Sequence, residues 1–137
     1  MKLIVMIDNE GGVSFNDRRQ SRDQYLNEYI VERIGNAKLW MNTYTYALFE
    51  DLNCENIIVD DDFIRKMGNE DYAICEKMSL NELESKIDFL IVCNWNRDYP
   101  YDTTLDIDKK NYDVKKICDI VGKSHEKITI EEWRKRI

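Results

Sequence analysis

Residues 2–51, KLIVMIDNEGGVSFNDRRQSRDQYLNEYIVERIGNAKLWMNTYTYALFED, contain the pattern that decides the fold. They begin with an apolar run at residues 3–7, which has the length of a strand buried on both faces. Gly11 and Gly12 follow, and such a pair is typical of a loop beside a ligand or of a tight turn. The first strand is therefore expected to lead into a glycine-containing loop.

A helix and a second strand are predicted next. Leu26, Ile30 and Ile34 recur at four-residue spacing, which predicts one buried helix face. Ser21 and Gln24 have the spacing of a capping box at the start of this helix. The expected elements are a helix that ends at Gly35, a strand at residues 39–41, and a helix that begins at Asn42 or Thr43 and carries Tyr46 and Phe49.

Further apolar runs, separated by segments of helical length, predict three more strands. Five strands alternating with helices indicate an α/β protein with a mostly parallel sheet. The run at residues 89–93 is the most apolar and is expected near the centre of the sheet. The additional strands are residues 56–59, 72–75 and 89–93, and the additional helices are residues 63–67 and a helix opened by the capping box of residues 79–82.

The C-terminal part is predicted to add antiparallel structure. Residues 105–108 alternate between apolar and acidic, which is typical of a strand with one solvated face. Residues 114–121 fit a returning strand, and residues 129–132 read as a capping box for a terminal helix that carries Trp133. The predicted fold is a single α/β domain over residues 1–137, a three-layer sandwich with a mostly parallel central sheet and an antiparallel C-terminal edge.

Composition narrows the class of function. The net charge of −7 at pH 7 argues against direct nucleic-acid binding, because neutralising phosphates needs clustered Lys and Arg. No apolar run has the length of a membrane span and no signal pattern precedes the first strand, so we expect a cytoplasmic protein. The four cysteines are widely spaced, which indicates reduced, buried thiols instead of a zinc site or a disulfide framework.

Taken together, these segments resemble the N-terminal part of dihydrofolate reductase. The shared order is an apolar strand, a glycine-bearing loop, a helix with an inward acid, and an apolar segment with a Thr and an aromatic residue, here Thr45 and Tyr46. Residues 102–106, DTTLD, are similar to the Asp-Thr-x-Phe-Pro strand of that family. The resemblance implies the reductase fold and places Asp23 where the family has its pterin-holding acid.

The chain departs from the family where the family binds its cofactor. Asn42 and Thr43 replace a Gly-Arg pair, so the cation that would grip a phosphate of NADPH is missing. No Gly-Gly turn follows Tyr72, where the family's backbone approaches the pyrophosphate. Residues 18–20 replace a Pro-Trp pair, and the C-terminal half looks shorter by about one strand–helix unit. We therefore expect no cofactor and no active reductase, although reductase-like chemistry is what the resemblance implies if the chain is an enzyme.

Polar and aromatic residues follow several of the predicted strands. In open α/β sheets, ligands bind in the crevice beyond the carboxyl ends of the strands. An aromatic ring, amides and a guanidinium there would recognise a planar or anionic group. A polar loop anchored to the core by a tryptophan explains the same residues equally well. The candidates are Asp8, Asn9, Trp40, Asn42, Thr45, Trp95, Asn96 and Arg97.

Arg18, Arg19 and Asp23 lie around the expected start of the first helix. Guanidinium donors and free backbone N–H groups at such a position would form an anion site. The alternative is a solvated loop whose arginines pair with surface acids. An Asp23 side chain directed inward would favour ligand binding.

Two further features carry possible chemistry. His125 is the only histidine, so any acid–base role of an imidazole at neutral pH must use it, and the alternative is a structural or exposed side chain. One histidine also excludes a two-zinc hydrolase of the ribonuclease Z type, a label carried by small proteins with a similar RRQS segment at residues 18–21. The acids at residues 60–62 would either cap the next helix or hold a divalent cation; we favour the cap and expect no metal.

Two functions remain open on the sequence. The first is a dihydrofolate reductase-like domain that binds a small anionic or nucleotide-like ligand in the cleft at the strand ends. The alternative is an acidic interaction or inhibitor protein, of a type carried by bacteria, phage or mobile elements, that binds a basic surface of a protein partner.

Overall fold

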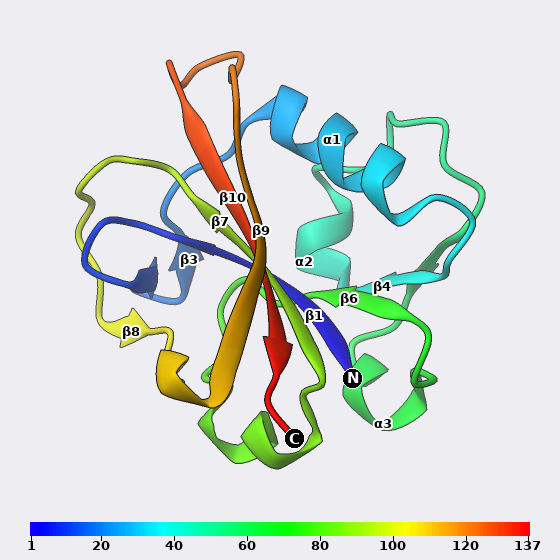
Figure 1. Cartoon of the computed structure of the whole chain (residues 1–137). Coiled ribbons are helices and arrows are strands. Elements are labelled where there is room, and N and C mark those ends of the chain that lie inside the picture. The colour runs from blue at the N-terminus through cyan, green and yellow to red at the C-terminus, as the bar shows by residue number, and fades with distance from the viewer.

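The computed structural model describes all residues 1–137, and its main sheet has seven strands (Figure 1). Five strands are parallel: β1 (Lys2–Ile7), β4 (Leu39–Met41), β5 (Ile57–Val59), β6 (Tyr72–Ile74) and β7 (Phe89–Asn94). Two are antiparallel: β9 (Tyr112–Ile120) and β10 (Ile128–Lys135). The order β5-β4-β6-β1-β7-β10-β9 confirms the mostly parallel sheet with an antiparallel C-terminal edge. The central strand is β1, and β7 lies beside it.

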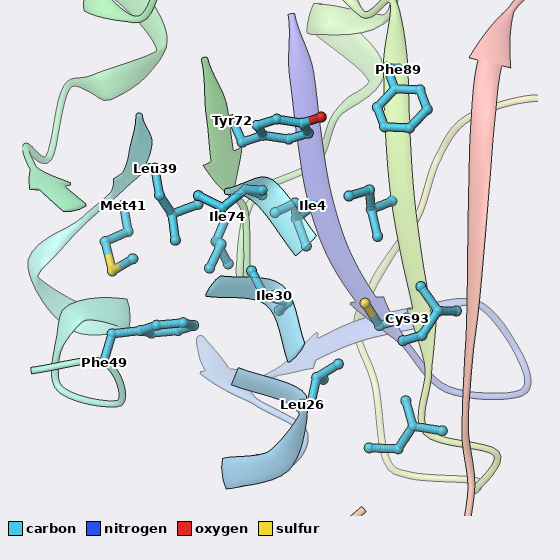
Figure 2. Packing of buried hydrophobic residues seen from close by; sticks show 14 of the residues in the cluster. Ile4, Leu26, Ile30, Leu39, Met41, Phe49, Tyr72, Ile74, Phe89 and Cys93 are labelled. Carbon is cyan, nitrogen blue, oxygen red and sulfur yellow. The ribbon is translucent and has the colours of Figure 1, made fainter. Parts of the chain in front are cut away.

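Helices cover both faces of the sheet. Two of them, α1 (Gln24–Ile34) and α2 (Thr43–Tyr46), lie on one face, while α3 (Phe63–Lys66) and the 3-10 helix η1 (Asn81–Lys86) lie on the other. In Figure 2, Leu26 and Ile30 of α1 pack against Ile4 and Ile74 of the sheet. Burying each such side chain contributes about 1.5–3 kcal/mol. The predicted three-layer sandwich is confirmed, and no helix has both the length and the apolarity that crossing a membrane requires.

The expected glycine-containing loop after β1 is a short turn in which Gly11 has a positive φ, and at Gly12 the chain enters a small second sheet. Its strands are β2 (Gly12–Phe15), β3 (Arg18–Arg19) and β8 (Thr103–Thr104), in the order β3-β2-β8. Asn16 and Asp17, both with positive φ, form the two-residue hairpin between β2 and β3. The strand expected at residues 105–108 is wrong, because after β8 the chain runs without strand pairing to a short 3-10 helix, η2 (Lys109–Asn111).

The terminal helix expected around residues 129–133 is also wrong. These residues lie in β10, which pairs with both β7 and β9, the returning strand that the sequence predicted. Within β10 the Glu132 carboxylate receives a bidentate contact from Arg33 of α1, at 2.7 and 2.8 Å. Hydrogen bonds to a strand on each side of β10 outweighed the local preference of these residues for a helix start, which is all that the capping-box pattern reports.

Two predicted helix starts differ from the observed ones. Asp23, not Ser21, is the N-cap of α1. The segment after Ser79 forms η1 instead of an α-helix, and its N-cap, Leu80, makes no side-chain capping bond. Leu80 and Ile87 are nevertheless buried against the sheet.

Candidate functional site

The carboxylate of Asp23 is fully buried and saturated with hydrogen bonds. Its Oδ1 accepts from the backbone N–H groups of Tyr25 (3.0 Å), Leu26 (3.3 Å) and Lys123 (2.9 Å), and its Oδ2 accepts from that of Ser124 (2.9 Å). Burial alone would raise the pKa of Asp23, but the donors, led by the Lys123 N–H, outweigh it and hold the pKa well below its usual range. Asp23 is therefore an ionised helix cap inside the protein.

His125 contacts Asp23 and two hydroxyl groups. Nδ1 lies 2.9 Å from Oδ2 of Asp23, and Nε2 lies 3.0 Å from Oγ of Ser21 and 3.1 Å from the hydroxyl of Tyr99. An ionised carboxylate only accepts hydrogen bonds, so Nδ1 carries a proton. The imidazole also stacks on Trp95, with ring centroids 4.6 Å apart and planes inclined by 26°. The ring is thus held in one orientation from three sides.

The turn between β9 and β10 brings His125 over the start of α1. Gly122 makes this approach possible, because a Cβ there would lie 2.6 Å from Oδ2 of Asp23 and 2.6 Å from the carbonyl oxygen of His125. Sequence reasoning missed Gly122, Tyr99 and Ser124 as parts of the site. A glycine directly after the predicted strand at residues 114–121 was the one available signal, and it does not indicate which side chain the backbone approaches.

Asp8, at the end of β1, is a second buried and saturated carboxylate. Its Oδ1 accepts from the N–H groups of Glu10 (2.9 Å) and Gly12 (2.8 Å), and its Oδ2 accepts from Nε2 of Gln20 (2.9 Å) and the N–H of Tyr99 (3.3 Å). Asp8 therefore joins the segment after β1 to the segment that carries Tyr99, and its lone pairs are already used within the chain.

The residues after β7 lie next to the His125 turn. The N–H of Asn9 donates to the carbonyl of Arg97 (3.0 Å), and the Arg97 guanidinium donates to the carbonyl of Ser124 (3.1 Å). Asn96 has a positive φ, and its amide donates to Oγ1 of Thr129 at 2.9 Å. These contacts place Asn9, Asn96 and Arg97 beside His125, where they tie loops to one another.

A second cluster surrounds Glu76, directly beyond β6. Arg19 makes a bidentate contact with Glu76 at 2.8 and 3.0 Å, and the Thr45 hydroxyl donates to Glu76 at 2.8 Å. The Glu76 side chain is only 2% exposed, and Arg19 also stacks over Tyr44 with its guanidinium carbon 4.0 Å from the ring centroid. Burial alone would lower the pKa of Arg19, but the contact with Glu76 raises it. Arg19 is therefore committed to an internal ion pair, whereas Arg18 is exposed in β3.

The backbone donors at the start of α2 are also used within the chain. Oδ1 of Asn42 accepts from the N–H of Thr45, which confirms Asn42 as the cap, and Oδ1 of Asp61 accepts from the N–H of Thr43, both at 2.8 Å. Residues 60–62 form no cluster that could hold a metal ion. Trp40 lies in the core on the opposite face from α1, and its Nε1 donates to Asp71 at 2.9 Å.

A cavity of about 620 Å³ lies between the start of α1 and the segment after α2. Two of its lining residues are cations: Arg22 is exposed, and Nζ of Lys123 contacts the amide oxygen of Gln24 at 2.8 Å. Asp51, across the cavity, is also exposed. The remaining polar lining residues include Asp23, Asn27 and Ser124, so the cavity borders the Asp23–His125 contact.

A scan against protein-family models gives no match, and a search of curated proteins finds no similar sequence. Among solved structures, dihydrofolate reductase from Enterococcus faecalis, complexed with NADP(H) and RAB-propyl, is similar in fold. The TM-score is 0.66 at 13% sequence identity, over 99% of this chain and 96% of that chain. The chain has a dihydrofolate reductase-like fold. The resemblance read from the sequence is confirmed at the level of the fold.

Within this dihydrofolate reductase-like fold, the predicted site residues fall into two groups, with Trp40 and the exposed Arg18 outside both. Asp8, Asn9, Asp23, Trp95, Asn96, Arg97 and His125 gather around the turn between β9 and β10; Arg19, Asn42 and Thr45 lie around Glu76 and the start of α2; Trp40 lies in the core. Asp23 and His125 were separate candidates in the sequence, and only the tertiary structure joins them.

Proposed function

We propose that this protein binds a small anionic or nucleotide-like ligand in the cavity between α1 and the segment after α2, and that it is not an NADPH-dependent reductase. The cavity itself carries the proposal, because its volume of about 620 Å³ lies in the range of small-molecule sites. Arg22 and Lys123 face it without an acid partner beside the N-terminal end of α1. These cations favour a negative charge at the rim, whereas the dipole of α1 is already met by the ionised carboxylate of Asp23.

We assign recognition of the ligand to residues at the rim of this cavity and not to the carboxylate of Asp23. The acceptor positions of the Asp23 carboxylate are occupied by the backbone of Lys123 and Ser124 and by His125, so a heterocycle would have to displace internal donors to bind it. The charged groups of Arg22 and Lys123 and the amide of Asn27 are better placed to contact a ligand, with Asp51 on the opposite side disfavouring groups of high negative charge.

The residues around α2 fit a dinucleotide phosphate poorly. A phosphate beside Thr43 and Thr45 would compete with Asp61 and Asn42 for the backbone donors, and it would face the buried carboxylate of Glu76. Arg19 is already paired with that carboxylate and is therefore not free to balance a phosphate. The commitment of Arg19 to an internal ion pair supports the part of the proposal that the protein is not an NADPH-dependent reductase.

A thermal-shift screen tests the proposal. The panel contains inorganic phosphate, mononucleotides, folates, NADP and NADPH, applied to the parent, Arg22→Ala, Lys123→Ala and the exposed control Lys38→Ala. A ligand present at 100 times its Kd stabilises the folded state by about 2.7 kcal/mol. We expect a shift with a small anion that both site variants lose and Lys38→Ala keeps, and no oxidation of NADPH with dihydrofolate.

A flat screen would overturn ligand binding in this cavity. The interaction-protein alternative would then be the function to test, by capture from a lysate of a basic partner that salt releases.

A further inference from the structure

The side chains of Ser21, His125 and Asp23 stand in the relationship of nucleophile, base and orienting acid. Oγ of Ser21 lies 3.0 Å from Nε2 of His125, and Nδ1 of the same ring lies 2.9 Å from Oδ2 of Asp23. Both distances lie within the reach expected of a nucleophile activated by an oriented base. With the proton on Nδ1, the lone pair of Nε2 faces the hydroxyl groups of Ser21 and Tyr99 and can accept the Ser21 proton.

We propose that Ser21 is the nucleophile of a hydrolytic site for small carboxylic esters, with His125 as general base and Asp23 as its positioning residue. This site is distinct from the anion contacts assigned to Arg22 and Lys123, and it does not depend on them. It also accounts for Ser21, which the sequence marked as a helix cap but which does not cap α1.

The surroundings of the three residues support this assignment. Asp23 cannot rotate away from the ring, because backbone N–H groups of two separate segments hold its carboxylate. His125 cannot tilt, because it stacks on Trp95. Ser21 is half-buried in the loop before α1, and the cavity lined by its neighbour Arg22 borders this loop.

Tyr99 supplies a second donor beside Ser21. Its hydroxyl lies 3.4 Å from Oγ of Ser21 and 3.1 Å from Nε2 of His125. From this position it can donate to an oxyanion that forms on a carbonyl attacked by Ser21. Its backbone is fixed by the contact of its N–H with Asp8 at 3.3 Å, which gives that buried acid a positioning role.

The reaction proceeds in two displacements. Oγ of Ser21 attacks the carbonyl carbon while its proton passes to Nε2 of His125, and the bond to the alcohol oxygen then breaks as His125 returns the proton to that oxygen. Water next attacks the carbonyl carbon of the Ser21 ester and loses a proton to Nε2. The bond between that carbon and Oγ then breaks, His125 protonates Oγ, and the acyl group leaves as a carboxylic acid. Water is the only co-reactant.

Reaction of the whole protein with two probes tests the site. p-Nitrophenyl acetate reports turnover, and diisopropyl fluorophosphate reports the nucleophile by intact mass and peptide mapping. We expect one diisopropylphosphoryl group on Ser21, and a loss of p-nitrophenol release of about 100-fold or more in Ser21→Ala and His125→Gln. The exposed serine control, Ser85→Ala, should behave as the parent.

Folding is monitored by circular dichroism and thermal unfolding so that loss of structure is not read as loss of chemistry. Ser21→Ala should remain folded, because Tyr99 still reaches Nε2 of His125. Ser21→Cys adds a second readout: a thiol beside Nε2 should be alkylated by iodoacetamide faster than Cys54 or Cys118. An unlabelled parent, a label elsewhere, or equal rates in the parent and folded Ser21→Ala would each overturn the proposal and leave the three residues as a structural lock.

Discussion

Nδ1 of His125 lies 2.9 Å from Oδ2 of Asp23, although 102 positions separate the two residues in the sequence. This contact joins the first turn of α1 to the turn between β9 and β10. Both side chains are at most 2% exposed, so the contact between Nδ1 and Oδ2 is buried. The ionised state of the Asp23 carboxylate strengthens this contact.

Stability is expected to fall in acid, in part through Asp23. The pKa of Asp23 in the folded protein lies below the value of about 3.9 of an unfolded chain, so its contribution is fully present above that pH and is lost as the pH falls below it. Urea unfolding of the parent and Asp23→Asn between pH 7 and pH 3 measures this. Asp23→Asn should be less stable by about 3 kcal/mol at pH 7, with the difference narrowing in acid. A difference that does not change with pH would contradict the prediction.

Gly122→Ala is expected to destabilise the protein by about 2–3 kcal/mol. The new Cβ would lie 2.6 Å from both an Asp23 oxygen and the backbone oxygen of His125, so the turn must move away from α1. Gly68→Ala is the matched control, since its Cβ would meet the Asp71 side chain at 3.3 Å in an exposed loop. Chemical denaturation measures the free energy of unfolding of both variants. An equal, small loss in both would contradict the prediction, because the turn would then move away from α1 without destabilising the protein.

Replacing only one partner of the ion pair between Arg33 and Glu132 should cost about 3 kcal/mol. Glu132 is 8% exposed, and the hydrogen bond from Arg33 lowers its pKa, so Arg33→Met leaves an uncompensated charge between α1 and β10. The double variant Arg33→Met/Glu132→Leu should recover most of the loss, because no buried charge remains. A double-mutant cycle by urea unfolding measures the coupling, and purely additive losses would argue against it.

Two thiols per chain should react with a disulfide reagent in the native protein at pH 8. Burial raises the pKa of Cys75 to about 12 and also raises that of Cys93, whereas Cys54 and Cys118 are partly exposed. Release of thionitrobenzoate counts the reactive thiols, and all four should react after denaturation. Four fast thiols in the folded state would mean that the core opens more readily than its packing implies.

The sequence by itself determined the layers of this protein. The apolar runs at residues 3–7, 39–41 and 89–93 became parallel strands because strands buried on both faces need an unbroken apolar segment. The four-residue spacing from Leu26 to Ile34 became the buried face of α1 because side chains at that spacing share one side of a helix. These patterns involve residues that lie close together in the chain, so they can be recognised from the sequence without knowledge of the fold.

Tertiary structure decided the rest. Residues 129–132 have the local pattern of a helix start, but two neighbouring strands supply their hydrogen bonds, and no local pattern contains those partners. The same reason applies to the site. Asp23, Ser21 and His125 come together only because the turn that contains Gly122 folds over the start of α1, and that contact depends on the position of β9 and β10 in the sheet.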